Sequence, residues 1–362
     1  MGDVANFSKG TGYSKSDLKG TGSPIILYGR LYTKYETIIR NIDTFVVPKS
    51  GSVFSKGGEV IVPGSGETAE DISIASVVEP AGILLGGDLN IIYPNSDLDP
   101  AFLAITISNG KPHFDMARRA QGKSVVHLHN ADLKHILLKT PNLSEQKRIS
   151  KIFESLDQTI TLHEDKKRQL ERIKSALLQK MFANKSEYPA IRFEGFDKAW
   201  KQSKLGEITK VIPSKLYIST PSTHGNYLVI QQGDKPIAGF SDSKPFNSYN
   251  NITLFGDHTL SLFKPRSPFL VASDGIKILS PSIEMNGLFY FYALEKYKPQ
   301  SEGYKRHFTI LKKSEANFPT DIDEQKQISI LLLRTDNLID KQQLRIDKLN
   351  ETKKSLLQNM FI

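Results

Sequence analysis

One stretch of the sequence matches the relaxed pattern of a phosphate-binding loop, which would cradle the phosphates of a nucleotide. Residues 117–124 read Ala-Arg-Arg-Ala-Gln-Gly-Lys-Ser. Such a loop needs a strand before it and a helix after it, because main-chain amides and the positive end of the helix then face the phosphates. Here a helix-like stretch precedes the loop, and a β-like run at residues 125–129 follows it. The order is reversed, so we predict that this stretch binds no nucleotide.

Histidines and carboxylates offer no clear catalytic or metal site either. His127 and His129 could present two imidazoles on one strand face, but the sequence places no third ligand, which favours an ordinary strand face. The segment 256–258, Gly-Asp-His, lacks the nucleophile and the orienting group of a catalytic triad. The absence of cysteine excludes a disulfide framework, a thiolate metal site and a cysteine nucleophile. The sequence therefore offers no convincing catalytic constellation, which weakens the hypothesis of an enzyme, and we expect no cofactor or metal in this chain.

Clusters that interleave basic and aromatic residues remain as candidate binding sites. Lysine and arginine neutralise phosphates, and arginine also pairs with guanine edges in the major groove. For any one of these residues, the simpler interpretation is a solvated charge beside a core aromatic ring. The clusters around residues 118–123 and 304–308 lie at matching distances ahead of two similar segments, which favours binding. The predicted DNA-binding residues are Tyr28, Arg30, Tyr32, Lys34, Arg118, Arg119, Lys123, Lys264, Arg266, Lys305, Arg306 and His307.

The elements that would position these clusters are revealed by an internal repeat. Residues 143–182 and 322–361 align without a gap at an offset of 179 residues, and both end in Leu-Leu-Gln-x-Met-Phe. Each segment is predicted to be one long helix, since neither contains glycine or proline, and Pro141 and Pro319 lie just upstream. We expect Ser144 and Asp323 to cap the two helices. Forty residues at about 1.5 Å each give a rod of about 60 Å.

An apolar stripe runs along each predicted helix and must be buried against another surface. The other helix of the repeat is the economical partner, and we expect the two to pair as an antiparallel coiled coil. The alternative is that each helix packs separately on the domain before it. The residues predicted to pack between the helices are Ile149, Leu156, Leu170, Leu177, Ile328, Leu338, Leu349 and Leu356.

The segments outside the helices are rich in glycine, proline, serine, asparagine and aromatic residues. Short β-like runs at 24–28, 59–62 and 227–230 are separated by turn residues, which predicts β-rich mixed domains. Residues 98–108 and 285–297 could each form a short helix. We thus predict an α+β protein with a pseudo-two-fold repeat: a domain at 1–142, a helix at 143–185, a second domain at 186–321 and a second helix at 322–362.

Length and charge set further limits. The 362 residues suffice for two domains with cores of their own. The net charge of +9 and a pI near 9.3 make a polyanionic partner plausible. Residues 1–142, however, carry 14 basic and 14 acidic residues, so the first domain would need a local basic patch. No apolar run approaches the roughly 20 residues that span a bilayer, and residues 1–10 lack a signal-peptide apolar region. We expect a cytoplasmic protein without membrane contact.

The order of domain, helix, domain, helix resembles the specificity subunit of type I restriction-modification systems over essentially the whole chain. The resemblance rests on Leu-Ser-Glu-Gln-Lys-Arg-Ile at 143–149, Ile-Asp-Glu-Gln-Lys-Gln-Ile at 322–328, an aspartate further along each helix (Asp157, Asp336), and the shared closing motif. Phe193-x-Gly195-Phe196, Trp200 and residues 204–207 are similar to the family's opening of a target-recognition domain, and Gly122 and Gly303 lie where the family places a glycine before its last strand. The start at residues 1–4 corresponds to residues 205–208, so we expect the first domain to lack this lead-in.

The resemblance implies a non-catalytic DNA reader. Each domain would recognise one half of a split double-stranded DNA target, and the paired helices would fix the gap between the halves. Two methyltransferase subunits and restriction/translocase subunits would be its partners. S-adenosylmethionine, ATP and Mg would belong to those partners. The competing hypothesis is a coiled-coil adaptor with two β-rich binding modules, for which the neutral first domain is the best support.

Overall fold

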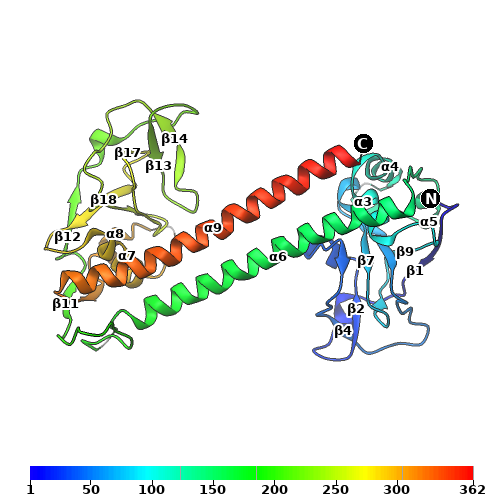
Figure 1. Ribbon diagram of the computed structural model, residues 1–362, viewed down its shortest axis with the longest axis horizontal. Coiled ribbons are helices and arrows are strands. Elements are labelled where there is room, and N and C mark those ends of the chain that lie inside the picture. Colours follow the sequence, from blue (N-terminus) through cyan, green and yellow to red (C-terminus); the bar gives the residue numbers. More distant parts are fainter. Residues whose placement is uncertain (123, 185, 304, 362) are drawn as a thin grey trace. The chain divides into compact units, whose positions relative to one another are not determined.

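A computed structural model describes residues 1–122, 124–184, 186–303 and 305–361. The chain divides by contacts into two compact units, Met1–Glu164 with Leu344–Ile362 (unit 1) and Asp165–Gln343 (unit 2). Two long helices, α6 (Leu143–Lys180) and α9 (Ile322–Met360), are each divided between the units (Figure 1). Each unit therefore contains one β-rich domain, the first half of the helix that follows it, and the second half of the other helix.

The domain of unit 1 is a mixed α/β assembly. In the described part of the chain, its sheets have the strand orders β1-β9-β5-β7-β3, β4-β2-β8 and β10-β6. Its elements are β1 (Ala5–Lys9), η1 (Lys15–Asp17), β2 (Ser23–Ile26), α1 (Arg30–Thr33), β3 (Ile38–Ile39), β4 (Phe45–Val46), β5 (Glu59–Pro63), β6 (Ser65–Gly66), α2 (Ala69–Ile72), β7 (Ser76–Val78), β8 (Leu84–Leu85), β9 (Leu89–Pro94), α3 (Pro100–Ser108), α4 (Gly110–Arg119), β10 (Val126–His127) and α5 (Asn130–Lys134).

The domain of unit 2 is built in the same way. Its described sheets have the orders β12-β18-β15-β16, β14-β13-β17 and β11-β19. Its elements are β11 (Lys201–Lys204), β12 (Thr209–Ile212), η2 (Lys215–Tyr217), β13 (Tyr227–Ile230), β14 (Ile237–Ser241), β15 (Thr253–Gly256), β16 (Leu262–Phe263), β17 (Phe269–Val271), β18 (Ile276–Pro281), α7 (Gly287–Tyr297), α8 (Phe308–Leu311) and β19 (Glu315–Phe318).

The repeat found in the helices extends into the domains. In unit 1, β2 pairs antiparallel with β4 and parallel with the later strand β8. In unit 2, β13 pairs antiparallel with β14 and parallel with β17. One apolar helix follows the main sheet in each unit, α3 in the first and α7 in the second, and at least half of the side chains of each helix are buried. The predicted α+β fold with an internal repeat is confirmed, and both predicted short helices are present.

Matched contacts within each unit show that the helices run antiparallel. In unit 1, the ring centroid of Phe153 on α6 lies 5.9 Å from that of Phe361, the residue just after α9. Asp157 of α6 also forms an ion pair with Lys353 of α9. In unit 2, Lys174 of α6 binds Asp336 of α9 at 2.9 Å. Asp336 and Lys353 lie 179 residues after Asp157 and Lys174, so one ion pair occurs twice.

The helix caps differ from the prediction. Asn142 Oδ1 accepts the amide of Glu145, and Asp321 Oδ1 accepts the amides of Asp323 and Glu324. The caps are therefore Asn142 and Asp321, and the proposal of Ser144 and Asp323 was wrong. The first orphan amides of each helix are bonded by the residue just outside it, and a serine or aspartate inside the first turn cannot reach them as well.

The packing stripe also differs in part from the prediction. Ile328 is buried, whereas Ile149, Leu156, Leu170, Leu177, Leu349 and Leu356 are half-buried. Leu338 is 47% exposed, which removes it from the packed residues. The most deeply buried apolar side chains of the two helices include Phe153, Ile160, Leu332 and Ile346. The domains cover a different edge of each stripe from the one that the heptad count selects.

No helix in the described ranges is both long and apolar enough to cross a membrane.

Candidate nucleic-acid interface

Two tyrosines form the exposed part of the first predicted cluster. Tyr28 and Tyr32 meet edge to face with ring centroids 6.2 Å apart, and each is 37% exposed. The Tyr32 hydroxyl donates to the Ser65 carbonyl oxygen at 2.6 Å, and burial raises its pKa, so it remains a neutral donor. Exposed aromatic faces held by hydrogen bonds are suited to contact with sugars and bases.

The charges of the same cluster have different roles. Arg30 is 9% exposed and donates to Asp43 and Glu36, both at 2.7 Å, and to the Asn41 carbonyl oxygen. Its guanidinium thus stabilises the turn and is not available to a phosphate, which corrects the sequence prediction. Lys34 is half-exposed, and its Nζ lies 2.9 Å from Asp43 Oδ2. Hydrogen bonds from Lys34, the larger cause, and from Arg30 lower the pKa of Asp43 to about 2.

A second cluster of unit 1 joins the first through one pair of strands. Arg118 and Arg119 end α4, and two residues later Gln121 exchanges main-chain hydrogen bonds with His127. His127 Nδ1 lies 3.1 Å from Ser65 Oγ, and the Ser65 carbonyl oxygen binds Tyr32. The structure thus brings the Tyr28–Lys34 and Arg118–Arg119 segments to one region. The predicted residue Lys123 lies outside the described residues.

His127 and His129 do not form a metal site with other side chains in the described ranges. Their rings stack with centroids 6.4 Å apart, and His129 Nδ1 lies 3.4 Å from Lys9 Nζ. Within those ranges no group of three or more histidine, aspartate or glutamate side chains is placed to hold a metal ion. Residues 117–119 end helix α4, and the next strand in the described part of the chain is β10, so a helix comes first and a strand follows, as the sequence indicated.

In unit 2, Lys264 and Arg266 follow β16 on a surface loop. Lys264 Nζ donates to the carbonyl oxygens of Asn250 and Ile252, at 2.6 and 2.8 Å. Burial lowers its pKa to about 8. Arg266 is exposed and lies 3.4 Å from Asn337 Oδ1 on α9. Both side chains have N–H groups that could still bind an anion, but the ammonium group of Lys264 has only one N–H that is not already donated.

The remaining predicted residues of unit 2 divide into exposed and buried ones. Lys305 and Arg306 are exposed, and Lys305 lies 3.1 Å from Glu302. His307 is fully buried: Nε2 accepts the Glu302 amide and Nδ1 lies 3.2 Å from the Asp257 carbonyl oxygen. It therefore cannot touch DNA without unfolding this loop. The repeat gave no signal of this burial, because His129, which precedes α5 as His307 precedes α8, is exposed.

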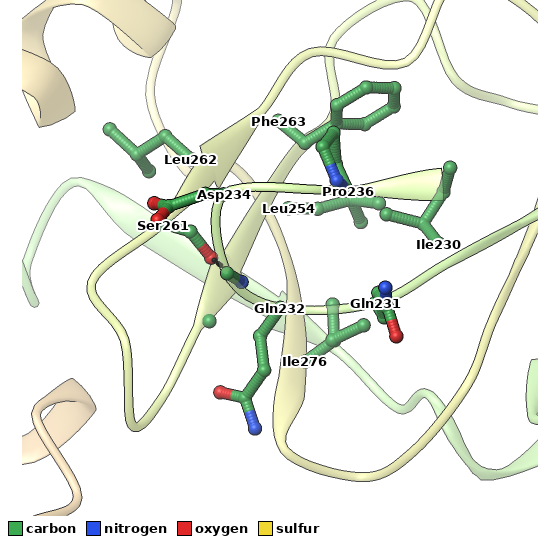
Figure 2. Close-up of a pocket in the computed structure, with 12 residues that line it drawn as sticks. Ile230, Gln231, Gln232, Asp234, Pro236, Leu254, Ser261, Leu262, Phe263 and Ile276 are labelled. Atoms are coloured by element: carbon green, nitrogen blue, oxygen red, sulfur yellow. Dashed lines mark hydrogen bonds between the residues drawn. The ribbon is translucent and has the colours of Figure 1, made fainter. Parts of the chain in front are cut away.

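Sequence reasoning missed a cavity in unit 2. It has a volume of about 260 Å³ and lies where the turn after β13 meets β15 and β16 (Figure 2). Its polar lining comes from Gln231, Gln232, Asp234 and Ser261, and its apolar lining includes Ile230, Leu254 and Phe263. The candidate residues were chosen for basic and aromatic side chains, and Gln231 and Gln232 are neither. The available signal was the position of this turn, which in the repeat matches the turn at Tyr28.

One face of each long helix stays exposed. On α6 a shallow hollow is lined by Arg148, Lys151, Ile152, Ser155, Leu156 and Thr159. On α9 the matching face carries Ile330, Arg334 and Leu338, of which Ile330 is 45% exposed. Both faces mix aliphatic and basic side chains, which is a composition suited to binding another protein.

A family model for the type I restriction modification DNA specificity domain matches residues 1–172. A Methanocaldococcus jannaschii protein, described as the MjaX type I restriction enzyme specificity subunit, is 24% identical over 317 residues, covering 77% of this chain and 71% of its own length. The matched domain and helix recur in the second half of the chain. Residues 1–172 thus match the DNA specificity domain of type I restriction-modification systems, and most of the chain is similar to a specificity subunit of such a system.

Solved structures share this fold. The S subunit of a type I restriction-modification system from M. genitalium aligns with a TM-score of 0.67 at 13% identity, over 99% of this chain and 94% of its own. A chain from work on complex assembly and conformational transition of the type I R-M system aligns with a TM-score of 0.53 at 18% identity, over 99% of this chain and 96% of its own. Specificity subunits are the non-catalytic DNA-recognition chains of these systems.

Proposed function

We propose that this specificity subunit recognises a double-stranded DNA target in two halves, one read by each unit, with α6 and α9 fixing the gap between the halves. The observation that carries the proposal is the duplicated architecture: each domain repeats the other's strand pairing, and each long helix contributes to both units. A stiff connection between two modest binding sites multiplies their specificity, because the second half binds at a high effective concentration.

The proposed DNA surface of each unit excludes the side chains that packing occupies. Arg30 and His307 are removed because their polar groups serve the fold. Arginine and lysine side chains would supply phosphate contacts, and the two exposed tyrosines would supply contacts to sugars or bases. The proposed residues are Tyr28, Tyr32, Lys34, Arg118, Arg119 and Lys123 in unit 1, and Lys264, Arg266, Lys305 and Arg306 in unit 2.

We also propose that the exposed helix faces receive the partner proteins. Two similar faces, around Ile152 on α6 and around Leu338 on α9, fit two copies of a methyltransferase subunit, which would carry S-adenosylmethionine. Restriction/translocase subunits, with ATP and Mg, would join this assembly. Because the substrate is the host's DNA, we place the complex in the cytoplasm.

The direct test is a map of N6-methyladenine in the genome of cells with and without this gene. We expect methylation to disappear from one split motif when the gene is deleted and to return when it is restored. Unchanged methylation in cells that express the methyltransferase subunits would contradict the proposal.

The second test concerns Arg306. Arg306→Ala should weaken binding of the target duplex and reduce the slope of log K against log salt by about 0.9, the value for one lost phosphate contact. Lys313→Ala, another exposed cation of unit 2, is the matched control. Salt titrations by fluorescence anisotropy measure both. An equal slope for Arg306→Ala and the unaltered chain would exclude Arg306 from the interface. The absence of any salt-dependent duplex binding by the unaltered chain would favour a protein-binding adaptor.

A further inference from the structure

The turn after β13 in unit 2 occupies the place of the turn after β2 in unit 1. Both strands follow a short 3-10 helix and belong to the same antiparallel-plus-parallel arrangement. The carbonyl groups of their last residues, Ile26 and Ile230, both accept an amide just after the parallel strand. The residues that follow read Leu-Tyr-Gly-Arg at 27–30 and Gln-Gln-Gly-Asp at 231–234. The glycine is common to both turns, whereas the side chains around it change completely.

Gln232 is held in one orientation at the cavity. Its Oε1 accepts the main-chain amide of His258 at 3.1 Å. Two glycines make room for it: a Cβ atom on Gly256 would lie 2.7 Å from Gln232 Cβ, and one on Gly275 would lie 3.0 Å from Nε2. In the described part of the chain, Nε2 has no hydrogen-bond acceptor, and the side chain is half-buried. The result is a fixed amide whose two N–H donors are unused.

Acceptors lie on the same rim. Gln231 donates its Nε2 to the Lys235 carbonyl oxygen at 2.9 Å, which leaves Oε1 as an acceptor. The exposed carboxylate of Asp234 adds a second acceptor. Figure 2 shows Gln231, Gln232 and Asp234 along this one turn, with Leu254 and Ile276 among the apolar residues that line the same cavity. The carboxylate of Asp234 would repel a phosphate. The edge of a base, in contrast, presents hydrogen-bond donors and acceptors side by side, and its ring has apolar faces.

We propose that this cavity receives a base edge of the half-target read by unit 2, with Gln232 donating to a base acceptor and Gln231 accepting from a base donor. Tyr28 has the corresponding place in unit 1. The inference rests on the proposed function and adds to it the residues that set the sequence. Because the two turns share their backbone and differ in their side chains, the two halves of the target would differ in sequence.

The test variant is Gln232→Glu. The substitution keeps size and shape, and one carboxylate oxygen still accepts the His258 amide, but the free Nε2 donor becomes an acceptor. The full chain, unaltered and variant, is presented with a pool of duplexes that carry a random central sequence. We expect the variant to select a different base at one position of one half of the motif, with the other half and the gap unchanged. Discrimination at that position should change about 10-fold or more.

Two further variants complete the experiment. Gln327→Glu makes the same change of charge at an exposed position on α9 of unit 2 and should select the original motif. Gln232→Met removes the donor without adding charge and should relax the preference at the same position. If both Gln232 variants select the original motif, the cavity does not read a base. If the unaltered chain selects no split motif, the proposed function itself is wrong.

Discussion

A residue that recurs in both halves of the chain can have different neighbours in each. Glu324 is 1% exposed and binds Arg192 Nε at 2.7 Å and Trp200 Nε1 at 3.1 Å. Its counterpart Glu145 is exposed in the first turn of α6. Gln146 and Gln325, in contrast, have equivalent partners, and each is 1% exposed. Each side chain donates to the carbonyl oxygen of the proline before its helix. Each also accepts the main-chain amide of the residue that caps the apolar helix of its domain, α3 or α7. The repeated glutamine thus joins each long helix to its domain.

Lys264 gives a prediction of pH dependence. Its pKa of about 8 lies below the ordinary value of 10.5, so it loses its charge on the folded chain above pH 8 while the unfolded chain keeps the proton. The unfolded state then binds more protons, and stability should rise from pH 8 to about 10.5. DNA binding should change in the opposite direction, since a neutral amine attracts no phosphate.

The measurement is the salt slope of duplex binding at pH 7 and pH 9. The slope of the unaltered chain should become shallower by up to about 0.9 at pH 9, the contribution of one phosphate contact. Lys264→Arg keeps its charge at both values and should lose less slope. Equal changes in the two proteins would show that Lys264 does not contact DNA.

At the scale of elements, the repeated ion pairs fix which turns of the helices face each other. Lys174 lies between Glu295 and Asp336, at 2.7 and 2.9 Å; burial lowers its pKa, but the two carboxylates outweigh burial and raise it. Asp157 and Lys353 make the matching pair in unit 1 and are 32% and 24% exposed.

Reversing the charges tests this role. Asp157→Lys or Lys353→Asp alone should destabilise unit 1, and the double reversal should recover about 1 kcal/mol, a coupling at the upper end for a partly exposed pair. Urea unfolding of the four proteins gives the coupling energy. Asp157→Lys combined with Lys174→Asp, which pairs residues from different units, is the control and should show no recovery. Recovery by that control, or none by the true pair, would contradict the assignment.

The sequence predicted elements better than exact contacts. Period and composition were sufficient for both long helices, the β-rich domains and their repetition, because these features depend on patterns summed over many residues. The caps at Asn142 and Asp321 and the burial of His307 depend on single backbone positions. The heptad count selected Leu338 because it ignores the domains, which cover one side of each helix.

At the scale of the whole molecule, our proposal assigns the sequences of the two half-targets and the length of the gap between them to different parts of the chain. The turns that we propose to contact bases belong to the domains, whereas the proposed gap depends on the length of α6 and α9, which have 38 and 39 residues. A change in one should therefore leave the other unaltered, provided that the apolar stripe keeps its register. Seven residues equal two turns of a coiled coil and preserve that register.

We therefore predict the effect of inserting the same seven-residue helical sequence after Lys166 and after Arg345, which are equivalent exposed positions of the repeat. Each helix becomes about 10 Å longer, and the gap in the methylated motif should grow by roughly three base pairs at 3.4 Å each. Both half-sequences should stay the same in the methylation map. Replacing seven residues there instead of inserting them should leave the gap unchanged, and inserting into one helix alone should abolish methylation because the ion pairs no longer match. A longer pair of helices with the original gap would show that the spacing is set elsewhere, for example by the methyltransferase subunits.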